Sequence, residues 1–119
     1  MPKVLVVDDS PIIYKIIGKA LAPLGFELVG HAGNGQMGLD MYERHRPDLV
    51  TLDITMPIMN GLEMAAALFQ KHPEAKVIML SSMDDDDLIE EAKKNGLRFF
   101  LAKPINAEKL VALVKTVLG

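Results

Sequence analysis

The sequence predicts an α/β fold in which a parallel β-sheet is covered by helices on both faces. Short apolar runs alternate with amphipathic runs five times along 119 residues, the pattern of repeated strand–helix units. The apolar runs lack polar alternation, as expected for strands buried on both faces. The connections between the runs are short, so right-handed crossovers are expected.

The first unit shows the signals most clearly. Residues Lys3–Val7 (KVLVV) are apolar and largely β-branched, which predicts a buried strand. Ser10 and Pro11 suit the N-cap and the first position of a helix. Apolar residues then recur at helical spacing as far as Leu24, and Gly25 is expected to end that helix.

The later units repeat this pattern. Pro57 and Asn60-Gly61 mark a loop after the third strand, and Asn95-Gly96 ends the fourth helix. Strands are expected at about residues 26–32, 48–53, 76–80 and 98–102, and helices at about 36–44, 62–71, 84–95 and 107–118.

Composition limits the class of protein. A length of 119 residues, half of them hydrophobic, suits one domain spanning residues 1–119. The chain has no cysteine, which excludes disulfides and thiolate metal sites. The apolar runs are too short for a signal-peptide core or a membrane span, so a cytoplasmic protein is expected. The net charge is −3 without a basic stripe, which argues against nucleic-acid binding.

Polar residues follow four of the five predicted strands. Asp8 and Asp9 follow the first, Asp53 ends the third, Ser81 follows the fourth and Lys103 follows the fifth. In doubly wound sheets, ligands bind at the carboxyl ends of the strands. Each residue alone has an ordinary explanation, such as a helix cap or a solvated lysine. Their coincidence at one edge predicts a functional site.

The chemistry of this set indicates phosphoryl transfer. Clustered carboxylates repel one another and favour a bound cation, and Mg²⁺ is a hard ion that prefers oxygen ligands. Phosphoryl transfer depends on positioning and charge neutralisation, which Mg²⁺ and Lys103 would supply from two sides. Asp53 would be the nucleophile that forms an acyl phosphate, and Ser81 would donate a hydrogen bond to the phosphoryl oxygens.

Four segments together resemble one known family. They are VLVVDDSP, PDLVTLDITMPIMNG, KVIMLSS and FFLAKPI, in this order. The chain resembles, over its whole length, the receiver domain of two-component response regulators, and within them the CheY-like single-domain type. The resemblance implies a flavodoxin-like (βα)5 fold with a five-stranded parallel sheet in the order 2-1-3-4-5.

The resemblance also implies a phosphoacceptor and a metal site. Asp53 would accept a phosphoryl group from a phosphohistidine of a sensor histidine kinase or phosphotransfer protein. Asp9 and Asp53 would bind Mg²⁺ through carboxylates, Asp8 mainly through a metal-bound water, and Thr55 through its backbone carbonyl.

A switch is implied as well. Lys103 and Ser81 would contact the phosphoryl group, and the bond from Lys103 to Pro104 is often cis in the family. Ser81 and Phe100 stand at the two switch positions, so phosphorylation would change the surface of the fourth helix, fifth strand and fifth helix for an output protein or a fused output domain. Phe100 lacks the hydroxyl of the family's frequent tyrosine, and its ordinary interpretation is a half-buried strand residue.

Three other functions remain as alternatives. A haloacid-dehalogenase-type phosphatase also uses Asp, Mg²⁺ and Lys, but Asp53-Ile54-Thr55 lacks the second acid of its motif. A flavin-binding electron carrier would need a hydroxyl-rich phosphate loop where this chain has Asp8 and Asp9. A receiver that works without phosphorylation would not need the acids, Ser81 and Lys103. The expected protein is therefore a signalling switch rather than an enzyme with an external substrate.

Overall fold

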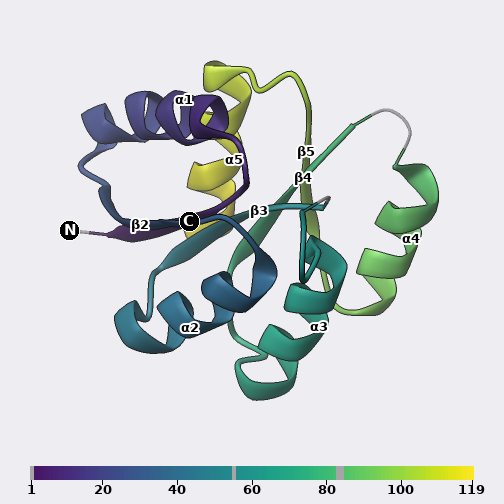
Figure 1. Cartoon of the computed structure of the whole chain (residues 1–119). Coiled ribbons are helices and arrows are strands. Elements are labelled where there is room, and N and C mark those ends of the chain that lie inside the picture. Colours follow the sequence, from purple (N-terminus) through teal and green to yellow (C-terminus); the bar gives the residue numbers. More distant parts are fainter. Residues whose placement is uncertain (1, 55, 83–84) are drawn as a thin grey trace.

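The computed structural model describes residues 2–54, 56–82 and 85–119. Within them, five short apolar runs pair in parallel in the order β2-β1-β3-β4-β5 (Figure 1). This confirms the predicted doubly wound sheet and its strand order. The strands are β1 (Lys3–Val7), β2 (Glu27–Ala32), β3 (Leu49–Asp53), β4 (Val77–Ser81) and β5 (Phe99–Ala102).

Each strand leads into a helix. The helices are α1 (Pro11–Leu21), α2 (Gly35–His45), α3 (Gly61–Lys71), α4 (Asp86–Lys94) and α5 (Ala107–Leu118), with a 3₁₀ turn, η1 (Ala22–Leu24), after α1. Ser10 caps α1 as predicted, because its side chain accepts a hydrogen bond from the Ile13 amide. No helix of the described residues has the length and apolarity needed to cross a membrane.

The first helix ends earlier than predicted. The α-helical pattern was expected to run to Leu24, but α1 ends at Leu21 and the chain tightens into η1. Pro23 explains the difference, because proline has no amide proton and its ring clashes with the carbonyl four residues before it. Gly25, with φ of 83°, closes the segment in the left-handed conformation, as its place in the sequence predicts.

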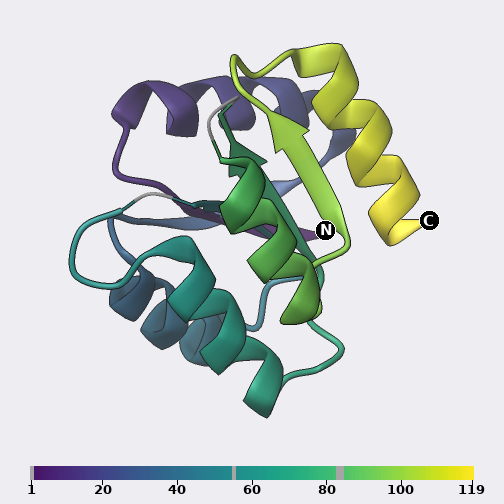
Figure 2. The same cartoon turned by 90° about the vertical axis from the view of Figure 1, so that its right-hand side faces the viewer.

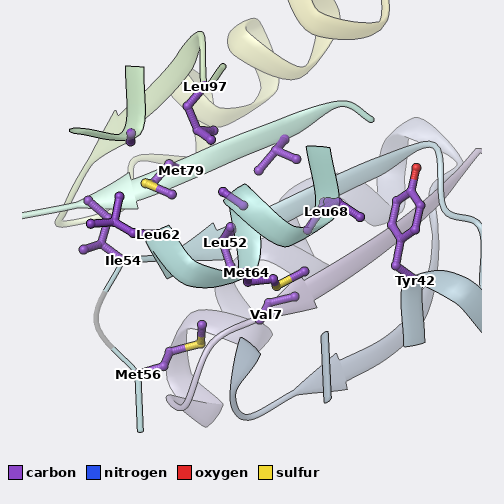
Figure 3. Packing of buried hydrophobic residues seen from close by; sticks show 14 of the residues in the cluster. Val7, Tyr42, Leu52, Ile54, Met56, Leu62, Met64, Leu68, Met79 and Leu97 are labelled. Carbon is purple, nitrogen blue, oxygen red and sulfur yellow. The ribbon is translucent and has the colours of Figure 1, made fainter. Parts of the chain in front are cut away.

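The sheet separates two hydrophobic clusters. Helices α1 and α5 cover one face, and α2, α3 and α4 cover the other (Figures 1 and 2). Because side chains alternate along a strand, Val4 and Val6 of β1 belong to the cluster under α1 and α5, called the α1/α5 cluster below. Leu5 and Val7 belong to the cluster under α2, α3 and α4, called the α2/α3/α4 cluster. In the α2/α3/α4 cluster, side chains of α3 interdigitate with those of the strands (Figure 3). The central strands are therefore fixed from both sides.

A histidine ties α2 to α3 at the end of the sheet opposite the strand carboxyl ends. The His72 Nε2 lies 2.6 Å from Oε1 of Glu43, and its ring packs against Tyr42 with centroids 5.0 Å apart. This hydrogen bond lowers the pKa of the Glu43 carboxyl. The contact holds the C-terminal ends of the two helices together and leaves their N-terminal ends to shape the other edge of the sheet.

One buried hydroxyl in the centre of the sheet has no hydrogen-bond partner among the described residues. Thr51 is fully buried in β3, and its neighbours across the sheet, Val6 and Ile78, belong to the α1/α5 cluster. A buried hydroxyl without a partner lowers stability, because it loses its hydrogen bonds to water on folding.

Thr51→Val should therefore stabilise the protein by about 1 kcal/mol, since valine has nearly the same shape and no polar atom to desolvate. Urea unfolding measures the free energy of unfolding. Thr116→Val is the control, because the Thr116 hydroxyl is exposed on α5 and bonds to the Ala112 carbonyl; we expect a change within about 0.5 kcal/mol. A destabilised Thr51→Val would contradict this account of the core.

Candidate functional site

The strand register brings the predicted residues to one edge of the sheet. Val7 of β1 pairs with Leu52 of β3, so the residues that follow them, Asp8 and Asp53, come next to each other. Asp53 in turn pairs with Leu80 of β4, one residue before Ser81. The carboxyl ends of three neighbouring strands therefore place two acids and a hydroxyl side by side.

Three carboxylates form a cluster at this edge. One oxygen each of Asp8, Asp9 and Asp53 lies within 4.8 Å of the others. The side chains differ in environment: Asp8 is fully buried and Asp53 is 5% exposed, whereas Asp9 is exposed. The structure thus brings together the three acids that the sequence placed at strand ends, and a cation at this point would contact groups from two strands.

The buried carboxyl of Asp8 lies in an environment that disfavours its negative charge. Burial raises the pKa of the Asp8 carboxyl, the amide of Ser10 lowers it, and the nearby charge of Asp53 raises it again. Oδ1 of Asp8 accepts a hydrogen bond from the Ser10 amide at 2.6 Å. Oδ2 is buried and has no hydrogen-bond partner among the described residues. An unpartnered carboxylate oxygen beside two other acids fits a hard divalent cation such as Mg²⁺.

Lys103 supplies the positive charge on the other side of Asp53. Its Nζ lies 3.0 Å from Oδ1 of Asp53. The backbone amide of Lys103 donates to the Ser81 carbonyl at 2.7 Å, which fixes the residue at the end of β5. The peptide bond between Lys103 and Pro104 is cis, the isomer expected for this bond. The lysine thus spans from β5 across the end of β4 to the acid of β3.

The remaining predicted site residues lie at different distances from the acids. Ser81 is 4% exposed at the end of β4, beside the acidic edge. Phe100 lies outside the acidic cluster: it is half-buried in β5 against the α2/α3/α4 cluster, with Nζ of Lys93 6.0 Å from its ring centroid. Thr55 lies outside the described residues.

Gly61 is a site residue that the sequence marked only as part of a turn. Its amide donates to the Ile54 carbonyl at 2.8 Å. A Cβ at this position would collide with the carbonyl oxygen of Asp53 and lie 2.9 Å from Cα of Ile54. The absent side chain therefore lets the N-terminus of α3 pack directly on the backbone of the central acid. The Asn-Gly pair signals a turn in the sequence, but not this close approach.

His31 is a second contact that the sequence did not indicate. Its Nε2 lies 2.6 Å from the carbonyl oxygen of Asp8. The three histidines of the chain show no metal-binding spacing, and only the pairing of β2 with β1 brings His31 next to the acidic pair.

The geometry now agrees with one family. The family model for the response regulator receiver domain matches residues 4–115. This chain belongs to that family. As a receiver domain it takes part in two-component phosphorelay signalling, and its acidic cluster lies where the sheet ends.

Close relatives of this receiver domain cover nearly all of it. The chemotaxis protein CheY of Listeria monocytogenes is 40% identical over 111 residues, covering 93% of this chain and 93% of its own length. The protein CcdB of Bacillus subtilis is 37% identical over 119 residues, covering 100% of this chain and 99% of its own length.

A solved structure is similarly close. The CheX–CheY–BeF3–Mg complex of Borrelia burgdorferi matches with a TM-score of 0.92 and 31% identity, over 99% of this chain and 90% of that one. This similarity supports the fold of the whole receiver domain.

Gly61→Ala should destabilise the receiver domain by about 2 kcal/mol or more, because the new methyl group must displace α3 or the backbone of Asp53. Urea unfolding tests this. Gly33→Ala is the matched control, since a Cβ there meets no atom within 4 Å and we expect a change within about 0.5 kcal/mol. Equal stabilities for the two variants would show that the close packing at Gly61 has no energetic importance.

Proposed function

We propose that residues 1–119 act as one receiver domain that accepts a phosphoryl group on Asp53. The observation that carries the proposal is the setting of this carboxylate. Asp53 is almost fully buried, is grouped with Asp8 and Asp9, and is contacted by Nζ of Lys103 at 3.0 Å. The Asp53 carboxylate therefore lies between two acids that would favour a bound cation and a lysine that would neutralise negative charge on a phosphoryl group.

The proposed step transfers a phosphoryl group from a phosphohistidine. An Asp53 carboxylate oxygen attacks the phosphorus, the new O–P bond forms, and the P–N bond breaks with its electron pair returning to the donor imidazole. Hydrolysis reverses the modification: water attacks the phosphorus, the O–P bond breaks, and inorganic phosphate leaves the restored carboxylate. Lys103 stabilises the negative charge on the transferred oxygens throughout.

Mg²⁺ fits the acidic side of the site. Asp8, Asp9 and Asp53 would hold it, with the backbone carbonyl of Thr55 as a further proposed ligand. The unpartnered Oδ2 of Asp8 supports this, because a cation would balance a buried oxygen that now lacks a donor. When bound, the ion neutralises phosphoryl charge. The similar Borrelia structure is described with both BeF3 and Mg, which supports the same pair of ligands here.

The proposed partners follow from this chemistry. A sensor histidine kinase or a phosphotransfer protein would supply the phosphoryl group, and an output protein or a fused output domain would respond to it. Outside the phosphotransfer and hydrolysis at Asp53, the chain would have no substrate of its own. A phosphatase that turns over external phosphate esters is the alternative that the test below separates.

Acetyl phosphate with Mg²⁺ should add one phosphoryl group to the wild type, detected by intact-protein mass spectrometry. Asp53→Asn should abolish the gain, because an amide is a very poor nucleophile at phosphorus. Asp40→Asn is the control and should keep the gain, since Asp40 is exposed on α2. A gain that persists in Asp53→Asn refutes the assignment, and multiple turnover of small phosphate esters favours the phosphatase.

Ser81 and Phe100 are the proposed switch. Ser81 ends β4 beside Asp53, and Phe100 lies on β5 next to α4. The hydroxyl of Ser81 would turn toward the new phosphoryl group and donate to it, and the Phe100 ring would fill the space that it leaves. The surface of α4, β5 and α5, which lie side by side in Figure 2, would then change its partner preference.

Ser81→Ala should separate phosphorylation from its readout. Beryllofluoride with Mg²⁺ serves as a stable phosphoryl mimic, and NMR follows the Phe100 ring and the amides of α4 and α5. The wild type should show shifts at these positions, and Ser81→Ala should lose most of them while still gaining mass with acetyl phosphate. Ser82→Ala, at the exposed neighbouring serine, should behave as the wild type. Full shifts in Ser81→Ala would contradict the switch.

A further inference from the structure

A histidine and a tyrosine form a stacked pair beside the acidic cluster. His31 of β2 places Nε2 2.6 Å from the carbonyl oxygen of Asp8. Its imidazole stacks on Tyr14 of α1, with ring centroids 4.4 Å apart and planes inclined by 10°. A carbonyl oxygen only accepts hydrogen bonds, so Nε2 is the donor. The pair therefore connects α1 and β2 to the end of β1.

This hydrogen bond lies where the strand ladder ends. The last paired residues of β1 and β2 are Val7 and Ala32, and the amide of Asp8 still donates to the Ala32 carbonyl at 2.8 Å. The carbonyl on the other side of Asp8 then accepts from the His31 side chain. Both backbone groups of Asp8 are thus tied to β2, and His31 extends the pairing of the two strands by one hydrogen bond.

The direction of the Asp8 carbonyl also restrains the backbone of Asp9. The carbonyl belongs to the rigid peptide plane that contains the Asp9 amide, so fixing its direction fixes the start of Asp9. Asp8 has a second restraint, because its Oδ1 accepts from the Ser10 amide. The Asp9 side chain is exposed and makes no hydrogen bond or ion pair with another described residue. The contact at the Asp8 carbonyl therefore restrains the backbone from which this side chain extends.

We propose that His31 is a positioning residue of the divalent-cation site, an inference that rests on the proposed function. Its hydrogen bond to the Asp8 carbonyl, braced by the Tyr14 ring, orients the Asp8–Asp9 peptide so that both carboxylates meet Asp53. The imidazole acts through the backbone and does not contact the ion. A change at His31 should therefore weaken Mg²⁺ binding although all three acids are still present.

Two substitutions separate the hydrogen bond from the ring. His31→Phe keeps an aromatic ring for Tyr14 and removes the donor, whereas His31→Gln removes the ring and keeps an N–H donor at a similar reach. A Mg²⁺ titration followed by ¹H–¹⁵N NMR gives the dissociation constant and reports in the same spectra that each variant is folded. Tyr14→Phe is the control that keeps the stack, and Asp53→Asn is the control that removes a ligand.

His31→Phe should weaken Mg²⁺ binding about fivefold, the factor expected from one net hydrogen bond. His31→Gln and Tyr14→Phe should stay within about twofold of the wild type. Rescue by glutamine distinguishes positioning from a general loss of packing. Should His31→Phe not fold, His31→Leu replaces it, because it also removes the donor; it too should bind Mg²⁺ about fivefold more weakly.

The outcomes separate this inference from the function on which it rests. Wild-type affinity in His31→Phe, or in His31→Leu where it replaces that variant, overturns the positioning role. Equal weakening in His31→Gln and His31→Phe also overturns it. In both cases, Mg²⁺ binding by the wild-type protein shows that the cation site itself is intact. A wild type whose Asp8, Asp9 and Asp53 amides do not respond to Mg²⁺ overturns the cation site, and the positioning role with it.

Discussion

The mutual repulsion of three carboxylates is the constraint on which the rest of this structure depends. Two of them, Asp8 and Asp53, are removed from water, so each charge is costly unless something nearby compensates for it. The ammonium of Lys103 compensates on one side of Asp53. On the other side, burial and then the nearby charge of Asp53 raise the pKa of the Asp8 carboxyl. The site is thus held in a state that gains from binding a cation and from neutralising its acids.

Such a site needs a rigid support. The strands that carry the acids are buried on both faces by two separate clusters, and the side chains of β3 are wholly enclosed. Moving Asp53 away from Asp8 would disrupt both clusters, because β3 contributes to each. The close packing of Gly61 on the Asp53 carbonyl adds a restraint from α3. The hydrophobic core therefore holds the acids together against their repulsion.

Much of this could be predicted from the sequence, because local signals and strand ends carry it. The bounds of β1 and the cap at Ser10 follow from pattern alone, and Asp8, Asp53, Ser81 and Lys103 meet because parallel strands end at one edge. Predicting the early end of α1 would have required giving the steric effect of Pro23 more weight than the apolar pattern that continues to Leu24. The contact of His31 with Asp8 depends on strand register, which spacing along the chain does not encode.

The hydrogen bonds at the end of β4 are compatible with the proposed switch at a rigid edge. The carbonyl of Ser81 accepts from the Lys103 amide, so the backbone of the serine helps to hold the lysine. The Ser81 hydroxyl belongs to the side chain, so rotation about the Cα–Cβ bond moves it without disturbing the backbone hydrogen bond to Lys103. A turn of the hydroxyl toward Asp53 would therefore leave Lys103 in place. In the proposed mechanism, Ser81 would therefore serve two groups: its carbonyl holds Lys103, which would stabilise the phosphoryl charge, and its hydroxyl would report that charge.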